Sequence, residues 1–283
     1  MIPGEIQFFT PTDTGKLETA LNDAFKAVMI SLPFSAGYYN SKQKSSLIKK
    51  QIQNRIPHIL FNLFAEEREL IIEKQYVQFW QTPIYDFIFH DTAIRIVHQW
   101  VNAGSLLPAE KYVTLPALIP NRYESDIWDE RNETPSHLKN RSFLFTFTQC
   151  NNYLTPEILI KPEILKFYES VEKKYGRWKS ADKPFSEQDF WAAFAEIGEL
   201  PHLSFRHVPT LIIAGIAGEN EFSFFADTDA KTHHGYRLYQ GQWYQNDPGG
   251  GLSFCNGLIK THIKNATCPM EALPSFLSRM KET

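Results

Sequence analysis

Two carboxylates and two imidazoles fall within eight residues in the last third of the chain. Asp227 and Asp229 follow the apolar segment 221–226, and His233 and His234 come directly after residues 230–232. Oxygen and nitrogen donors of these types bind divalent cations when they converge, and they can converge at the end of a strand. A polar hairpin turn, in which both aspartates bond their own backbone, accounts for the same residues. The turn is the preferred interpretation, and a divalent metal site is the alternative.

A second pair of metal-ligand types is His90-Asp91, inside a segment that we expect to be helical. With His58 before it and Asp126 after it, the pair offers donors that a hydrolytic metal centre could use. No regular helix is predicted around Asp126, and a chance His-Asp pair is common. We therefore interpret His90 and Asp91 as an exposed or internally bonded pair.

Three glycines, Gly249, Gly250 and Gly251, precede the segment 252–264, which we expect to be helical. Backbone N–H groups of a glycine loop at a helix N-terminus can bind an anion. The lysine and hydroxyl residue of a phosphate-binding loop are missing, as is the dinucleotide fingerprint. A flexible turn is the preferred interpretation, with anion binding as the alternative.

Large aromatic rings gather on a predicted hairpin whose tip is Gln240-Gly241. The residues are Tyr236, Tyr239, Trp243 and Tyr244. A β-layer of an α+β protein must bury one face, so packing in the core is the preferred interpretation. If the rings are exposed, they form an anchor surface for a partner protein.

Apolar periodicity predicts the elements that position these residues. A helix is expected over residues 10–28, with Thr10 as its N-cap. A second helix is expected to follow it and to end at Pro57. Further helices are expected at 65–80, 84–101, 162–176 and 186–198, where Trp191 is expected to be buried, and from about residue 269. Strands are expected at 143–147, 210–216, 221–226, 236–239 and 242–245.

These elements predict an α+β fold with a helical N-terminal layer, a mixed region and a C-terminal antiparallel β meander. The expected organisation is a mainly helical region 1–104, a linker or long surface excursion 105–141, and an α+β region 142–283 with a β-rich C-terminal part. One continuous domain is the alternative.

Composition narrows the classes of function. The 283 residues carry a formal charge of −3, which gives no long-range field for nucleic acid or an anionic membrane. Three cysteines at wide spacing are interpreted as free thiols in a reducing compartment. Without a signal segment or a run of about 20 apolar residues, a soluble cytoplasmic protein is expected.

Scarce glycine (14 residues), 14% aromatic residues and the lack of an intact catalytic motif favour a non-catalytic protein-binding module. Such a module is an inhibitor, an adaptor or an immunity-type protein. The expected partner is another protein, with no nucleic acid, no membrane and no cofactor. The alternative is a metal-dependent hydrolase or transferase that uses the Asp/His cluster at residues 227–234, so the sequence leaves enzymatic activity open.

Overall fold

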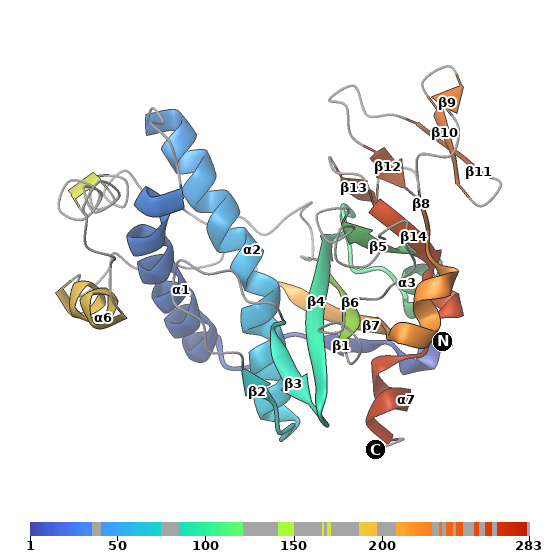
Figure 1. Ribbon diagram of the computed structural model, residues 1–283, viewed down its shortest axis with the longest axis horizontal. Helices are drawn as coiled ribbons and strands as arrows, with labels where there is room; N and C mark the ends of the chain where they lie inside the picture. The colour runs from blue at the N-terminus through green and yellow to red at the C-terminus, as the bar shows by residue number, and fades with distance from the viewer. Residues whose placement is uncertain are drawn as a thin grey trace.

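The computed structural model describes residues 1–35, 41–74, 85–120, 141–149, 166, 169–170, 187–196, 208–227, 232–233, 236–239, 242–245, 252–254, 258–261 and 265–281. Across these residues, helices are combined with a curled mixed sheet, which gives an α+β fold. Figure 1 shows the sheet in the middle of the molecule, between two helices and a second, mainly β layer.

The central sheet has six strands in the order β1-β7-β6-β4-β3-β2. The strands are β1 (Gln7–Phe9), β2 (Glu73–Lys74), β3 (Phe87–Phe89), β4 (Thr92–Trp100), β6 (Arg141–Gln149) and β7 (Thr210–Ala217). The pair β4–β6 is parallel, and the other pairs are antiparallel. A strand from the start of the chain, β1, therefore lies beside a strand more than 200 residues later, β7, in one sheet.

Two long helices, α1 (Thr14–Ser35) and α2 (Ser41–Glu67), cover one face of this sheet (Figure 1). The expected apolar stripe of α1 is buried, including Leu17, Leu21 and Phe25. The expected N-cap was wrong: Asp13 Oδ1 accepts the Lys16 N–H at 3.1 Å, as an N-cap side chain does. The helix α2 runs through Pro57 rather than ending there.

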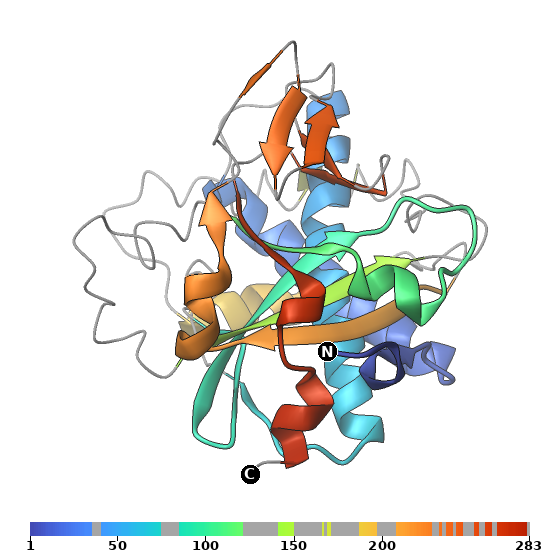
Figure 2. The same cartoon turned by 90° about the vertical axis from the view of Figure 1, so that its right-hand side faces the viewer.

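The other face of the sheet packs against a second layer, which Figure 2 shows in front of the sheet. This layer holds β5 (Pro116–Pro120), β8 (Ala226–Asp227) and β14 (Asn265–Pro269), with the helices η1 (Pro3–Glu5), α3 (Ala109–Val113) and η6 (Met270–Ala272). The last helix, α7 (Phe276–Lys281), places Phe276 in the core on the helix-covered side of the sheet. Within the region 105–141, α3 buries Tyr112 and Val113, and the strand β5 buries residues 116–119. Residues 121–140 lie outside the described residues.

Two predicted helices were wrong in the region after α2. The helix ends at Glu67 instead of extending over 65–80, and residues 87–100, within the helix expected at 84–101, form the hairpin β3–β4. Apolar side chains alternate along these strands, so that Ile94 and Ile96 share the face toward α1 and α2. The same apolar residues also fit a helical spacing, but the segment adopts the two-residue period of a strand.

Two further predictions were wrong in the last third. Residues 219–224 form the 3-10 helix η5 (Glu219–Phe224) instead of a strand, and 252–264 contains the paired strands β12 (Leu252–Phe254) and β13 (Ile259–Thr261) instead of a helix. The strands at 143–147 and 210–216 are confirmed. The hairpin strands β10 (Tyr236–Tyr239) and β11 (Gln242–Gln245) are also confirmed, with β9 (Thr232–His233) beside β10.

The helix α6 (Glu187–Glu196) is confirmed and packs beside α1 (Figure 1). The expected burial of Trp191 was wrong, because 52% of this residue is exposed. In the helix expected at 162–176, residues 166, 169 and 170 are described, and they are helical.

Candidate functional site

Titratable side chains meet between α2 and the helix-covered face of the sheet. His58 lies on α2, Asp86 directly precedes β3, and His98 is on β4. The Nδ1 atom of His58 is 3.5 Å from Asp86 Oδ1, and His98 Nδ1 is 3.1 Å from the Thr146 Oγ1 on β6. The cluster therefore joins α2 to three segments of the sheet.

The backbone of β4 fixes Asp86. The Asp86 N–H donates to the Ile94 carbonyl at 2.8 Å, and Asp86 Oδ2 accepts the Ile96 N–H at 2.6 Å. Its second carboxylate oxygen is left for His58. Asp86 thus holds the imidazole of His58 in one orientation, as a carboxylate does behind a proton-transferring histidine.

Two opposed effects set the pKa of His58. Desolvation by the surrounding protein lowers the pKa, and the charge of Asp86 raises it, while Arg55 and Arg95 lower it further. The net result is a pKa below the usual value of 6.5, although 38% of the side-chain surface remains exposed. His58 is therefore mainly neutral at pH 7.

The Nε2 atom of His98 is buried, whereas the side chain of His58 is partly exposed. Among the described residues, the Nε2 atom of His98 is one of the buried side-chain atoms without a hydrogen-bond partner, and Thr148 Oγ1 is another. Desolvation lowers the pKa of His98 well below 6.5, and the nearby His58 lowers it further. The ring also meets Trp100 edge to face, with centroids 5.0 Å apart. The site keeps His98 neutral.

This arrangement offers proton-transfer groups but not a metal centre. In the described part of the chain, no group of three or more His, Cys, Asp or Glu side chains is placed to hold a metal ion. His90 and Asp91 lie exposed at the β3–β4 turn rather than in a helix. Asp126, the distant ligand considered with them, lies outside the described residues.

The structure describes the backbone of some predicted site residues. Asp227 is in β8 opposite Ala266, and His233 is in β9 opposite Tyr236. The other predicted metal ligands, Asp229 and His234, and the predicted anion-binding residues Gly249, Gly250 and Gly251 lie outside the described residues. Both sites stay predictions.

The predicted aromatic cluster lies on paired strands. Leu238 is opposite Trp243, and Tyr236 is opposite Gln245; Tyr239 and Tyr244 occupy the remaining pairs of the same hairpin. The expected tip at 240–241 lies outside the described residues. The exposure of these aromatic rings stays a prediction.

A second polar network is structural. Gln149, 1% exposed at the end of β6, accepts the Tyr112 hydroxyl at 2.5 Å and the Leu107 N–H at 3.3 Å, and it donates to the Ser105 carbonyl. Burial raises the pKa of Tyr112, so its hydroxyl stays protonated and donates. The network anchors residues 103–112 to the sheet.

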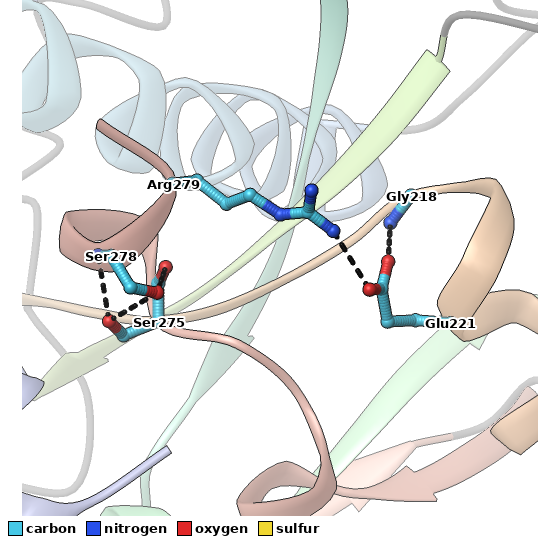
Figure 3. Close-up of polar contacts among 5 residues, drawn as sticks. All are labelled: Gly218, Glu221, Ser275, Ser278 and Arg279. Carbon is cyan, nitrogen blue, oxygen red and sulfur yellow. Dashed lines mark hydrogen bonds and ion pairs between the residues drawn. The ribbon is translucent and has the colours of Figure 1, made fainter. Parts of the chain in front are cut away.

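A third cluster joins η5 to α7 (Figure 3). Glu221 accepts Arg279 Nη2 and the Gly218 N–H, each at 2.8 Å, and its side chain is 11% exposed. Ser275 Oγ accepts the Ser278 N–H at 3.0 Å and caps α7. Every one of these polar groups has a structural partner, which leaves little for a ligand.

Of the three cysteines, the structure describes Cys268, which is a buried free thiol in β14. Burial raises its pKa to about 11. A thiol that stays protonated is a poor nucleophile, so Cys268 acts as a packing residue.

Sequence reasoning missed the grouping of His58, Asp86 and His98 because the three residues come from separate segments. One local signal was present: along β4, the apolar positions Ile94 and Ile96 are followed at the same period by His98. A polar side chain that continues a buried strand face is a reason to search for a partner.

Comparisons with known proteins add no assignment: no protein-family model matches the chain, and neither does any curated protein or solved structure. Each helix in the described part of the chain is too short or too polar to cross a bilayer.

Proposed function

We propose that this chain is a non-catalytic protein-binding module, such as an inhibitor, an adaptor or an immunity-type protein. The observation that supports it is the outward face of α6. The exposed positions that the structure describes on this helix are Gln188, Trp191, Ala192, Ala195 and Glu196. Three of them are apolar, and they follow the helical spacing of a single stripe.

Trp191 is the central feature of that stripe. A helix that packs on one neighbour normally turns polar residues toward water, whereas α6 packs on α1 and leaves Trp191 52% exposed. Tryptophan is enriched among the residues that carry most of the binding energy in protein interfaces. Small alanines beside it allow a partner surface to approach closely.

The hairpin β10–β11 is the second proposed contact. Tyr236, Tyr239, Trp243 and Tyr244 supply aromatic rings of the kind that interfaces favour. We retain with this proposal the division into regions 1–104, 105–141 and 142–283, the C-terminal meander and a cytoplasmic location. The metal-dependent alternative stays a prediction that elemental analysis tests directly.

The first experiment is native mass spectrometry of the protein expressed in its own host or together with the products of neighbouring genes, with elemental analysis of the same sample. The proposal expects a stoichiometric partner protein and no bound metal. A stoichiometric metal without a partner would overturn it and favour the Asp/His cluster.

Variants of the captured complex then test α6. Trp191→Ala is expected to weaken partner binding by about fivefold or more, the effect of losing an interface anchor worth over about 1 kcal/mol. Phe224→Ala is a matched control, because Phe224 is 51% exposed on η5 rather than on α6. Equal affinities for Trp191→Ala and the unmodified protein, measured by calorimetry, would remove α6 from the interface.

A further inference from the structure

The contact between α2 and the sheet contains a histidine that cannot be protonated in place. His98 lies on the β4 face that carries Ile94 and Ile96 toward α2, and its Nδ1 pairs with Thr146 Oγ1. Its Nε2 atom is shielded from solvent and has no hydrogen-bond partner. With Nε2 lacking an acceptor, the ring proton is best placed on Nδ1, where it donates to Thr146.

Protonation of His98 would add an N–H and a positive charge at this closed position. A buried donor without an acceptor is costly, and a buried charge without a counter-ion is costlier. Among the described residues, His58 on α2 acts on His98 directly, while Asp86 before β3, Arg55 on α2 and Arg95 on β4 act on His58. Asp86 is already held by His58 and the Ile96 N–H, so it is not free to compensate His98.

The helix above this position has a built-in weak point. Pro57, next to His58, carries no N–H, so α2 lacks one bond of its backbone ladder at that turn. On the C-terminal side of Pro57, Phe61 stacks on Phe87 and also contacts Phe64. On the N-terminal side, Ile48, Ile52 and Ile56 attach the helix to the core, all at 0% exposure.

We propose that the α2–sheet contact is an acid-sensitive switch, in which protonation of His98 moves the part of α2 before Pro57 off the sheet and exposes its isoleucine stripe. This regulatory device does not depend on the proposed protein-binding function. In this switch, residues 46–56 leave the sheet, and residues 60–66 remain packed on it.

The direction with pH follows from the protonation states. Because the pKa of His98 is lower in the closed state than its ordinary value of 6.5, the open state binds more protons below that pH. The closed state is fully favoured above pH 6.5 and loses stability as pH falls through this value. Because opening takes up one proton, the equilibrium constant for opening rises by up to about tenfold for each pH unit below 6.5.

Hydrogen exchange of the full chain, corrected for intrinsic exchange rates, tests the switch at a series of pH values below and above 6.5. The expected result is faster exchange of amides 46–56 at acid pH while amides 60–66 stay protected. Uniform acceleration of both segments would indicate global unfolding and overturn the proposal. No acceleration in either segment would also overturn it.

Variants separate His98 from the other histidines. His98→Asn keeps a side-chain donor near Thr146 and stays neutral, so it is expected to abolish the acid response. His90→Gln is the matched control, since His90 is exposed at the other end of the same sheet region. If His98→Asn does not fold, Pro57→Ala gives the second test, because restoring the backbone bond should reduce the opening of 46–56 severalfold. An acid response unchanged in Pro57→Ala would exclude the hinge.

Discussion

At the scale of single residues, the β3–β4 turn contains an unusual choice of side chains. His90 and Asp91 have φ values of 44° and 59°. Positive φ at both central residues is typical of a type I′ hairpin turn, and the pairing of Phe89 with Thr92 leaves two residues for the loop. Asn-Gly is the preferred pair in such turns because it accepts left-handed backbone at little cost.

Replacing His90-Asp91 with Asn-Gly should therefore stabilise the protein by about 1 kcal/mol. Urea denaturation at pH 7.5 would measure the free energy of unfolding. Asp91→Ala is the control, since alanine keeps the strained φ and should give no gain. A double variant no more stable than the unmodified protein would show that the turn carries no removable strain.

The positions of individual histidines and aspartates also explain why the candidate site was not predicted. Adjacency in sequence drew attention to His90-Asp91, but a tight turn directs that pair to solvent. The residues that do meet, His58, Asp86 and His98, are brought together by α2 packing on β4, which no local pattern encodes.

At the scale of elements, the C-terminus of α2 ends in a regular C-cap motif that carries glutamate at the position where glycine is usual. Leu70 N–H donates to the Ala65 carbonyl and Glu69 N–H to the Glu66 carbonyl, which is the bonding pattern of a Schellman motif. Glu69 occupies its left-handed position with φ 53°, where glycine is usual.

Glu69→Gly should stabilise the protein by up to about 1 kcal/mol, because glycine adopts this φ without steric cost. Thermal unfolding would report a higher Tm. Glu67→Gly is the matched control: Glu67 is the last helical residue, and glycine there should cost about 0.5–1 kcal/mol. Destabilisation by both variants would mean that Glu69 makes a compensating interaction.

The elements that sequence predicted are those with a clear local signal. Apolar residues of α1 repeat at helical spacing and form one buried stripe. Phe143, Phe145 and Phe147 alternate along β6, although this strand is buried on both faces. The hairpin β3–β4 was missed because its apolar residues fit both periods, and the turn lacked glycine. Tertiary packing decided between the two.

At the scale of the whole molecule, Phe61 links elements that are distant in sequence. Its ring lies 4.7 Å from Phe87 in β3, 5.9 Å from Phe64 and 5.9 Å from Phe276 in α7, measured between centroids. It is completely buried. Removing it would open a cavity where α2, the sheet and α7 meet.

Phe61→Ala should therefore destabilise the protein by about 3–5 kcal/mol, the usual cost of deleting a buried phenylalanine. The midpoint of urea denaturation would measure the loss. Phe224→Ala, at a position 51% exposed, should change stability by less than about 0.5 kcal/mol. Similar small losses for both would contradict a shared core at Phe61.

The strand order of the central sheet could not be predicted from the sequence, because it depends on contacts between distant segments. The parallel pair β4–β6 and the antiparallel pair β1–β7 join residues without any local turn between them. Short connections could be inferred from turn residues, whereas these pairings arise only when the whole core assembles.

The pairing of β1 with β7 also has a consequence for synthesis on the ribosome. Gln7 pairs with Ile213, and the Thr10 hydroxyl bonds that of Thr210, 200 residues later. At translation rates of about 5–20 residues per second, the first strand waits about 10–40 s for its partner to be made. During that interval the Phe8-Phe9 segment of each nascent chain is an unpaired apolar strand that chaperones can bind.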